Sequence, residues 1–320
     1  MTPQDKRIIA QWRRRIKGRP RLVLSIAKDP RSMEFEAFCK ALNRLVPELD
    51  IEREKGDSTP EIRISDNLHY RAVPLGPELG PFLKALQGVD TLAGDLTPAI
   101  RDRVSELGLP ATLKIFISSR CPFCPHTVSR LLPLAGASCR VQLSVVDALL
   151  FNEEAMAARV RSVPATILDD QFRWTGLVEI EEIVKIMQNR DPSQLSAESL
   201  QKMLHDGEAH HIARMMIRNG EIFPPYLDLL THKKWQTRLG AMVAFEYLVE
   251  ERKELASRII KPLWDNFPMA GQEIKGDILY ILGESRDPKA IPLLEKVLSA
   301  SYPEEIQEAA QEALEKIRGG

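Results

Sequence analysis

The stretch LKIFISSRCPFCPHTVSRLL, residues 113–132, joins an apolar segment to two cysteines that lie three positions apart. Leu113–Ser118 has the composition of a buried strand, and a helix is expected to open at Cys121-Pro122-Phe123-Cys124. Free backbone N–H groups and the helix dipole stabilise an anion at such a place. Because the thiolate is the reactive form of a cysteine, we expect Cys121 to be a nucleophile in disulfide exchange.

The other residues of this motif fit the same chemistry. Cys124 lies one helical turn after Cys121, within reach of an internal disulfide, and is expected to resolve a mixed disulfide. Pro122 suits the first helical position, and Phe123 offers an apolar contact beside the sulfur. The alternative is half of a zinc site, but the sequence has no second Cys-x-x-Cys, and His126 is too close to complete a usual ligand set. We therefore expect no metal, and no cofactor beyond a redox-active disulfide between the two cysteines.

Composition narrows the class of protein. Lys and Arg number 44 against 45 Asp and Glu, so the charge favours neither nucleic acid nor an anionic membrane as a partner. The sequence has no apolar run of about 18 residues and no secretory signal at its basic N-terminus, which predicts a soluble, cytoplasmic protein. Four cysteines are too few for a disulfide-scaffolded secreted protein, and Cys39 and Cys139 are expected to be buried on apolar faces.

One order of predicted elements occurs twice before residue 190: helix, strand, helix, strand, connection, hairpin, helix. The strand candidates are 22–27, 49–54, 61–64 and 70–73 in the first copy, and 113–118, 139–145, 165–168 and 172–175 in the second. Only about ten residues separate Ile51 from Glu61, so the first copy has no room for the helix that the second copy has at this point. We expect two mixed α/β sheets with flanking helices, one in residues 1–95 and one in residues 96–190.

Strand signals disappear after Asp191-Pro192-Ser193, and residues 191–320 are expected to form paired helices. The predicted pairs are 222–230 with 236–248, 255–264 with 272–282, and 288–298 with 304–317. The second helices share a local pattern of small and apolar residues, which predicts an all-α solenoid. This pattern resembles HEAT repeats, whose concave face usually binds a protein. The alternative is a docking or stabilising domain without a ligand.

Residues 1–190 resemble two families, through Cys-Pro-Phe-Cys-Pro, Val163-Pro164-Ala-Thr and the tandem arrangement of thioredoxin-like folds. One contains the protein disulfide oxidoreductases built from two glutaredoxin-like units. The other is the N-terminal domain of the alkyl hydroperoxide reductase flavoprotein subunit, in which the first unit is inactive. The resemblance implies that Pro164 is a cis proline facing the cysteines and that Val163 pairs its backbone with the substrate chain. It also implies that Glu78 supports the thiolate; the alternative for Glu78 is an exposed acid at a helix N-terminus.

The sequence departs from the flavoprotein family because it contains no Gly-x-Gly-x-x-Gly motif of a nicotinamide- or flavin-binding domain. We therefore expect a cytoplasmic thiol–disulfide oxidoreductase that exchanges disulfides with a protein substrate. An external reductase is expected to recharge it, and the helical repeats are expected to dock a protein partner. The alternative is a non-enzymatic adaptor or scaffold whose cysteine pair senses the redox state.

Overall fold

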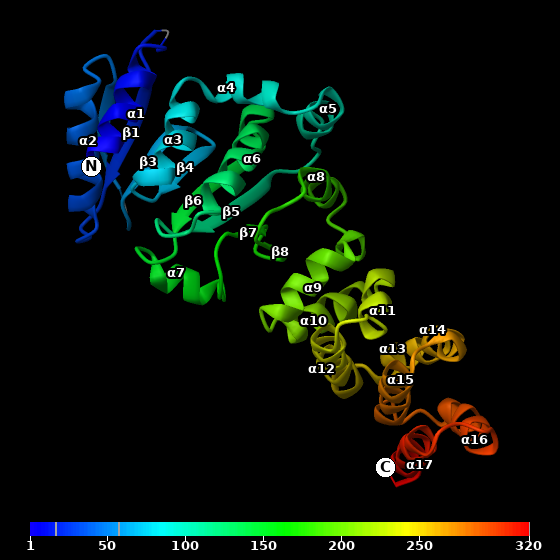
Figure 1. The fold of residues 1–320 in the computed structure, drawn as a ribbon. Coiled ribbons are helices and arrows are strands. Elements are labelled where there is room, and N and C mark those ends of the chain that lie inside the picture. The colour runs from blue at the N-terminus through cyan, green and yellow to red at the C-terminus, as the bar shows by residue number, and fades with distance from the viewer. Residues whose placement is uncertain (17, 57, 320) are drawn as a thin grey trace. The chain divides into compact units, whose positions relative to one another are not determined.

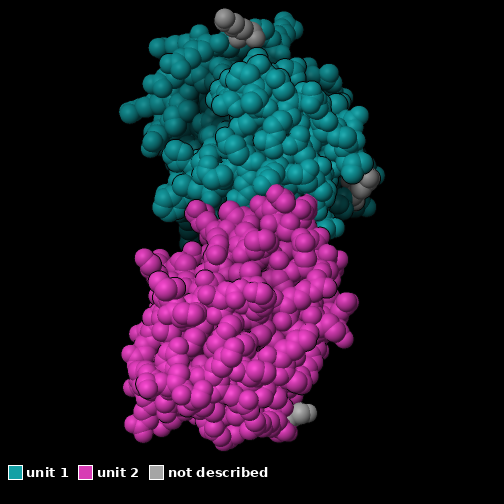
Figure 2. Space-filling view, turned by 90° about the vertical axis from the view of Figure 1, so that its right-hand side faces the viewer, with its two compact units in different colours: residues 1–190 teal, residues 191–320 magenta. Residues whose placement is uncertain are grey.

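The computed structural model describes residues 1–16, 18–56 and 58–319 of the chain. It divides into two compact units, residues 1–190 (unit 1) and residues 191–320 (unit 2), which Figure 2 draws in teal and magenta. The segment Asp191-Pro192-Ser193, predicted to be a linker, opens unit 2. The further division of unit 1 between residues 95 and 96 stays a prediction.

Unit 1 is built on one eight-stranded mixed sheet, in the strand order β2-β1-β3-β4-β6-β5-β7-β8 (Figure 1). The strands are β1 Arg21–Ile26, β2 Asp50–Lys55, β3 Glu61–Ser65, β4 Leu68–Arg71, β5 Ala111–Ile117, β6 Val141–Asp147, β7 Ala165–Leu168 and β8 Phe172–Thr175. The pairs β1–β2 and β5–β6 are parallel, whereas β3–β4 and β7–β8 are antiparallel hairpins. This mixed sheet with its helices confirms the predicted α/β fold class of unit 1.

Helices pack against the sheet and against one another. They are α1 Pro3–Arg13, α2 Ser32–Leu45, α3 Leu79–Leu86, α4 Val89–Leu92, α5 Pro98–Ser105, α6 Cys124–Ala137, α7 Asn152–Ala157 and α8 Ile180–Asn189. A 3-10 turn, Gly76–Glu78, leads into α3, and a second one, Ala93–Asp95, follows α4. Helix α6 packs against β6, and α3 and α4 pack against α6. Helix α4 could not be predicted from the sequence, because four residues are too few to show a helical period.

The two halves of unit 1 are joined inside the sheet, where β4 and β6 run parallel to each other. Asn67, in the turn between β3 and β4, is buried at this junction. Its Nδ2 donates to the carbonyl oxygens of Ala135, Ser138 and Val141, at 2.9, 3.2 and 3.0 Å. Because an unpaired buried amide is costly, these bonds fix the turn of the first half to the α6–β6 connection of the second.

Unit 2 consists of helices, as predicted. They are α9 Ala197–His205, α10 Ala209–Asn219, α11 Pro224–Leu230, α12 Trp235–Glu251, α13 Lys253–Ala256, α14 Ile260–Asn266, α15 Gln272–Glu284, α16 Ile291–Ser299 and α17 Glu304–Gly319. Helix α12 packs against both α10 and α15, and α15 packs against α17, so alternate helices stack in a row. Buried Arg238 of α12 links two of them, because its Nε donates to Asp277 of α15 at 2.5 Å. The assignment of these helices to HEAT-like repeats stays a prediction.

The two isolated cysteines differ in their surroundings. Cys39 is buried in α2, as predicted, whereas Cys139 is exposed, so its predicted buried position is wrong. The alternating pattern suggested a strand over 139–145, but α6 ends at Ala137 and β6 begins at Val141. Residue 139 therefore lies in the turn between them. In the part of the chain that the structure describes, no helix is long and apolar enough to span a bilayer.

Candidate active site

The cysteine pair lies where several connections leave the same edge of the sheet. Strands β5 and β6 are parallel, so their carboxyl ends lie together, and β7, antiparallel to β5, begins at this edge. Figure 1 shows α7, which follows β6, beside this end of the strands. The topology thereby brings Cys121 and Cys124, after β5, close to Val163 and Pro164, before β7.

Cys121 is half-buried and lies just before α6. Its Sγ accepts a hydrogen bond from the backbone N–H of Cys124 at 3.2 Å. The thiol also donates to the carbonyl oxygen of Val163, with Sγ 3.5 Å from that oxygen. The N–H donor to this sulfur belongs to the first residue of α6.

Cys124, the first residue of α6, is completely buried. Burial raises the pKa of its thiol far above the ordinary value, and the hydrogen bond with Cys121 and the negative charge of Glu78 raise it further. The pair therefore consists of an accessible sulfur, Cys121, and a sheltered sulfur that holds its proton.

Glu78 lies in the 3-10 turn before α3 and is only 3% exposed, so its alternative interpretation as an exposed helix acid is wrong. Burial raises the pKa of its carboxyl to about 7, and the charge of Asp147 contributes to the rise. Both carboxyl oxygens are buried and have no hydrogen-bond partner among the described residues. Its negative charge is the smallest of the causes that raise the pKa of the Cys124 thiol, and no hydrogen bond joins the two groups.

Val163 and Pro164 form the opposite wall of the site. The peptide bond between them is cis, as the resemblance implies. Pro164 is buried, and Val163 is half-buried. Phe123, the N-cap of α6, is 60% exposed, and Pro122 precedes this cap.

The helix starts later than predicted. It begins at Cys124, so the proline of its first turn is Pro125, and the predicted helical position of Pro122 is wrong. Pro125 suits this place because the first turn leaves its backbone N–H groups without helical partners.

Sequence reasoning missed two residues near Glu78. Asp147, the last residue of β6, raises the pKa of Glu78 through its charge. The negative charge of Glu78 in turn helps to raise the pKa of Tyr70, which is fully buried with its hydroxyl unpaired among the described residues. No local motif could have identified them, because the pairing of β4 with β6 brings together residues that lie far apart in the sequence.

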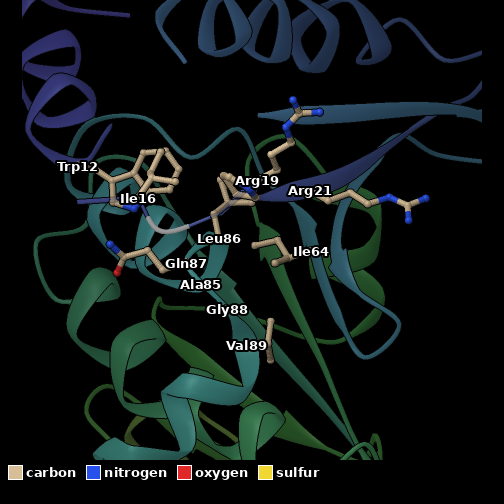
Figure 3. Close-up of a pocket in the computed structure, with 11 residues that line it drawn as sticks. Trp12, Ile16, Arg19, Arg21, Ile64, Ala85, Leu86, Gln87, Gly88 and Val89 are labelled. Carbon is tan, nitrogen blue, oxygen red and sulfur yellow. The ribbon is translucent and has the colours of Figure 1, made fainter. Parts of the chain in front are cut away.

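Metal sites and pockets elsewhere in the structure were the other candidates for ligand binding. Over the described ranges, no group of three His, Cys, Asp or Glu side chains is placed to hold a metal ion. A pocket of about 260 Å³, shown in Figure 3, has apolar walls that include Trp12, Ile64 and Leu86. It also adjoins Arg21, the first residue of β1. Because β1 runs parallel to β5 across the sheet, this pocket lies at the edge opposite Cys121.

Comparison with known proteins identifies part of unit 1. A family model described as a thioredoxin domain matches residues 111–188. This segment is therefore similar to a thioredoxin domain. It contains Cys121 and Cys124, the cis proline and strands β5 to β8.

Two curated relatives extend the similarity toward the N-terminus. An NADH dehydrogenase from Ferdinandcohnia aciditolerans is 22% identical over 202 residues, which cover 61% of this chain and 39% of that protein. A subunit of alkyl hydroperoxide reductase from Xanthomonas campestris pv. phaseoli is 25% identical over 188 residues, which cover 54% of this chain and 36% of that protein. The chain therefore spans less than half the length of these relatives.

A solved structure is similar in fold. The protein disulfide oxidoreductase from Aeropyrum pernix superimposes with a TM-score of 0.52 at 14% sequence identity, over 59% of this chain and 93% of that one. The comparisons confirm the resemblance that the sequence predicted, to a subunit of alkyl hydroperoxide reductase and to a protein disulfide oxidoreductase.

Proposed function

We propose that this chain is a thiol–disulfide oxidoreductase that transfers two electrons between its Cys121–Cys124 pair and a disulfide of a protein partner. The observation that carries this proposal is the contrast between the two sulfurs. Cys121 is half-exposed and accepts the N–H of Cys124 at 3.2 Å, whereas the Cys124 thiol is fully buried. The similarity of residues 111–188 to a thioredoxin domain supports a thiol–disulfide redox function.

In the direction of reduction, the reaction has two steps. The Cys121 thiolate attacks one sulfur of the partner's disulfide, that S–S bond breaks, and the partner's other sulfur leaves as a thiolate. Cys124 then loses its proton and attacks Cys121 Sγ, which releases the partner's second sulfur and forms the Cys121–Cys124 disulfide. The partner gains two electrons and two protons. An external dithiol reductase then supplies two electrons and two protons to this chain, which reduces the Cys121–Cys124 disulfide again.

Glu78 serves the second step as the acceptor of the Cys124 proton. A general base acts best when its pKa lies near the working pH, and burial raises the pKa of Glu78 to about 7. Its two oxygens have no hydrogen-bond partner within the described structure, so no competing bond holds the carboxylate. No metal or cofactor takes part in this scheme.

Four residues position the substrate in this proposal. The half-buried Val163 offers its backbone to an extended substrate segment, and Pro164 holds that backbone opposite Cys121. The exposed side chains of Phe123 and Pro122 contact the substrate beside the attacking sulfur.

We further propose that the protein works in the cytoplasm and that unit 2 docks a protein partner through HEAT-like repeats. The row of stacked helices α10, α12, α15 and α17 supports the second part, because such a row offers a continuous surface. The first half of unit 1 is proposed to be redox-inactive, since it has no cysteine pair.

Reduction of insulin disulfides, with dithiothreitol in place of the external reductase, tests the proposal. Cys121→Ser is expected to lose the whole of the chain-dependent rate, because Cys39 and Cys124 are buried and the exposed Cys139 lies outside the site. Cys139→Ser is the matched control, since it removes an exposed cysteine outside the site, and it should keep the wild-type rate. Turnover that survives in Cys121→Ser, or no turnover in the wild type, would refute the proposal; the second result favours the redox-sensing adaptor.

A further inference from the structure

Arginines without partners flank the cysteine site. Arg120 immediately precedes Cys121, and Arg161 lies two residues before Val163, whose carbonyl oxygen is 3.5 Å from Cys121 Sγ. Both side chains are exposed, and neither guanidinium forms a hydrogen bond or ion pair with a described residue. Two exposed positive charges therefore belong to the segments that carry the reactive sulfur and the carbonyl group opposite it, and no described residue neutralises them.

Several carboxylates near this edge of the sheet already have partners. The ion pairs are Glu153–Arg31, Glu154–Arg71, Glu154–Lys114 and Glu179–Arg130. Asp147 accepts hydrogen bonds from the backbone N–H groups of Leu149 and Leu150, and Glu78 is buried. Arg120 and Arg161, in contrast, have no such partner among the described residues.

Large apolar side chains are exposed on the same edge. Phe123 follows β5, Leu149 and Met156 follow β6, and Leu177 follows β8. They are 60%, 64%, 69% and 47% exposed, respectively. Because β8 is antiparallel to β7, it ends at the edge where β7 begins, so all four belong to connections at the cysteine end of the sheet. Apolar side chains gathered beside a reactive group are typical of a surface that binds a partner.

We propose that this surface selects protein partners whose disulfide lies in an apolar segment with flanking acidic side chains, which Arg120 and Arg161 bind. The inference rests on the proposed function and names its substrate class. The apolar contacts hold the segment against Phe123 and Leu149, while the two arginines attract its carboxylates. Complementary charge of this kind accelerates association more than it tightens the final complex, and it weakens as salt screens it.

Three cyclic disulfide peptides with one apolar sequence test the inference. Their flanking positions carry Glu, Lys or Gln, and dithiothreitol recharges the enzyme. We expect the wild-type full chain to have a kcat/KM for the Glu peptide at least about tenfold above that for the Lys peptide at low ionic strength. The ratio should fall toward one at high ionic strength, where the Debye length is only a few ångströms. This readout needs no variant.

Charge reversal then assigns the effect to these residues. Arg120→Glu/Arg161→Glu should invert the preference, so that the Lys peptide is reduced faster than the Glu peptide. Arg19→Glu/Arg101→Glu makes the same change in net charge at exposed positions away from the cysteine edge, and it should keep the wild-type preference.

The outcomes separate the inference from the proposed function. A wild-type ratio near one, or an equal loss of preference in the control variant, would overturn the inference while the Gln peptide is still reduced. If no peptide is reduced in a Cys121-dependent manner, the proposed function itself fails.

Discussion

At the scale of single residues, Glu78 is the most unusual group of the site, because it is a buried carboxyl with no hydrogen-bond partner in the described structure. Such a group binds its proton more tightly in the folded protein, where its pKa is about 7, than in the unfolded chain, where it is near 4.5. A fold that merely needed an apolar contact here would gain stability from a neutral residue. The stability lost by burying this carboxyl supports a chemical role for Glu78.

Glu78→Gln should therefore change how stability depends on pH. Below pH 4.5 the carboxyl is protonated in both states; between 4.5 and about 7 the unfolded chain releases the proton first, so the free energy of unfolding falls as pH rises. From about pH 5 to about pH 8 this group should lower wild-type stability by about 2.5 kcal/mol, a loss that the neutral variant lacks. Urea unfolding of both proteins at the two pH values measures the difference. An identical pH dependence in the two proteins would show that Glu78 ionises normally.

The local sequence was enough to predict the two cysteines and Pro164, because the strand, the helix and the proline are encoded by short segments. It was not enough to show that Glu78 is buried beside Asp147 and Tyr70. Those three residues belong to different elements, and only the pairing of β4 with β6 brings them together. Cys139 shows the opposite error, since the alternating pattern began two residues before the true start of β6 at Val141.

At the scale of elements, close helix contacts depend on glycine. In α15, a Cβ on Gly283 would lie 2.8 Å from Ala313 Cα and 3.0 Å from Ala313 Cβ, so α17 approaches the helix backbone there. In α6, a Cβ on Gly136 would lie 2.3 Å from the carbonyl oxygen of Val89. These two close contacts determine how near α4 lies to α6 and α17 to α15. Hydrophobic periodicity could not predict them, because it shows which face of a helix is buried but not how close two helices come.

Gly283→Ala should destabilise unit 2 by about 1–3 kcal/mol, because the new methyl group overlaps the backbone of α17. Gly276→Ala in the same helix is the matched control. A Cβ there meets no atom within 4 Å, and the better helix propensity of alanine should stabilise the protein by about 0.5–1 kcal/mol. Thermal and urea unfolding of both variants measures the difference. If Gly283→Ala were as stable as the control, the close packing of α15 against α17 would be contradicted.

At the scale of the whole molecule, the sequence predicted two copies of one α/β unit but not how they join. The order of elements is a property of each copy alone, whereas the parallel pairing of β4 with β6 depends on which strand edges remain free in both. Asn67 then fixes the junction through three backbone carbonyls. One continuous sheet explains how Glu78 of the first half reaches the cysteines of the second.

In our proposal, unit 1 carries out the disulfide exchange and the helical unit 2 binds the protein partner. Residues 1–190 contain the whole sheet, Cys121 and Cys124, and the segment that matches the thioredoxin-domain model lies entirely within them. The sequence has no nicotinamide- or flavin-binding motif, so electrons are proposed to come from another protein. Partner recognition is therefore divided, in this account, between the cysteine edge of unit 1 and the stacked helices of unit 2.

The central claim, that Cys121 attacks and the buried Cys124 resolves, is tested most directly by trapping the mixed disulfide. The full-length Cys124→Ser and Cys121→Ser variants are reduced, freed of reductant and mixed with oxidised insulin, and the products are separated under non-reducing conditions and identified by mass spectrometry. Cys124→Ser should form a covalent adduct through Cys121 that dithiothreitol releases, and Cys121→Ser should form none. An adduct that forms with Cys121→Ser and not with Cys124→Ser would contradict the account.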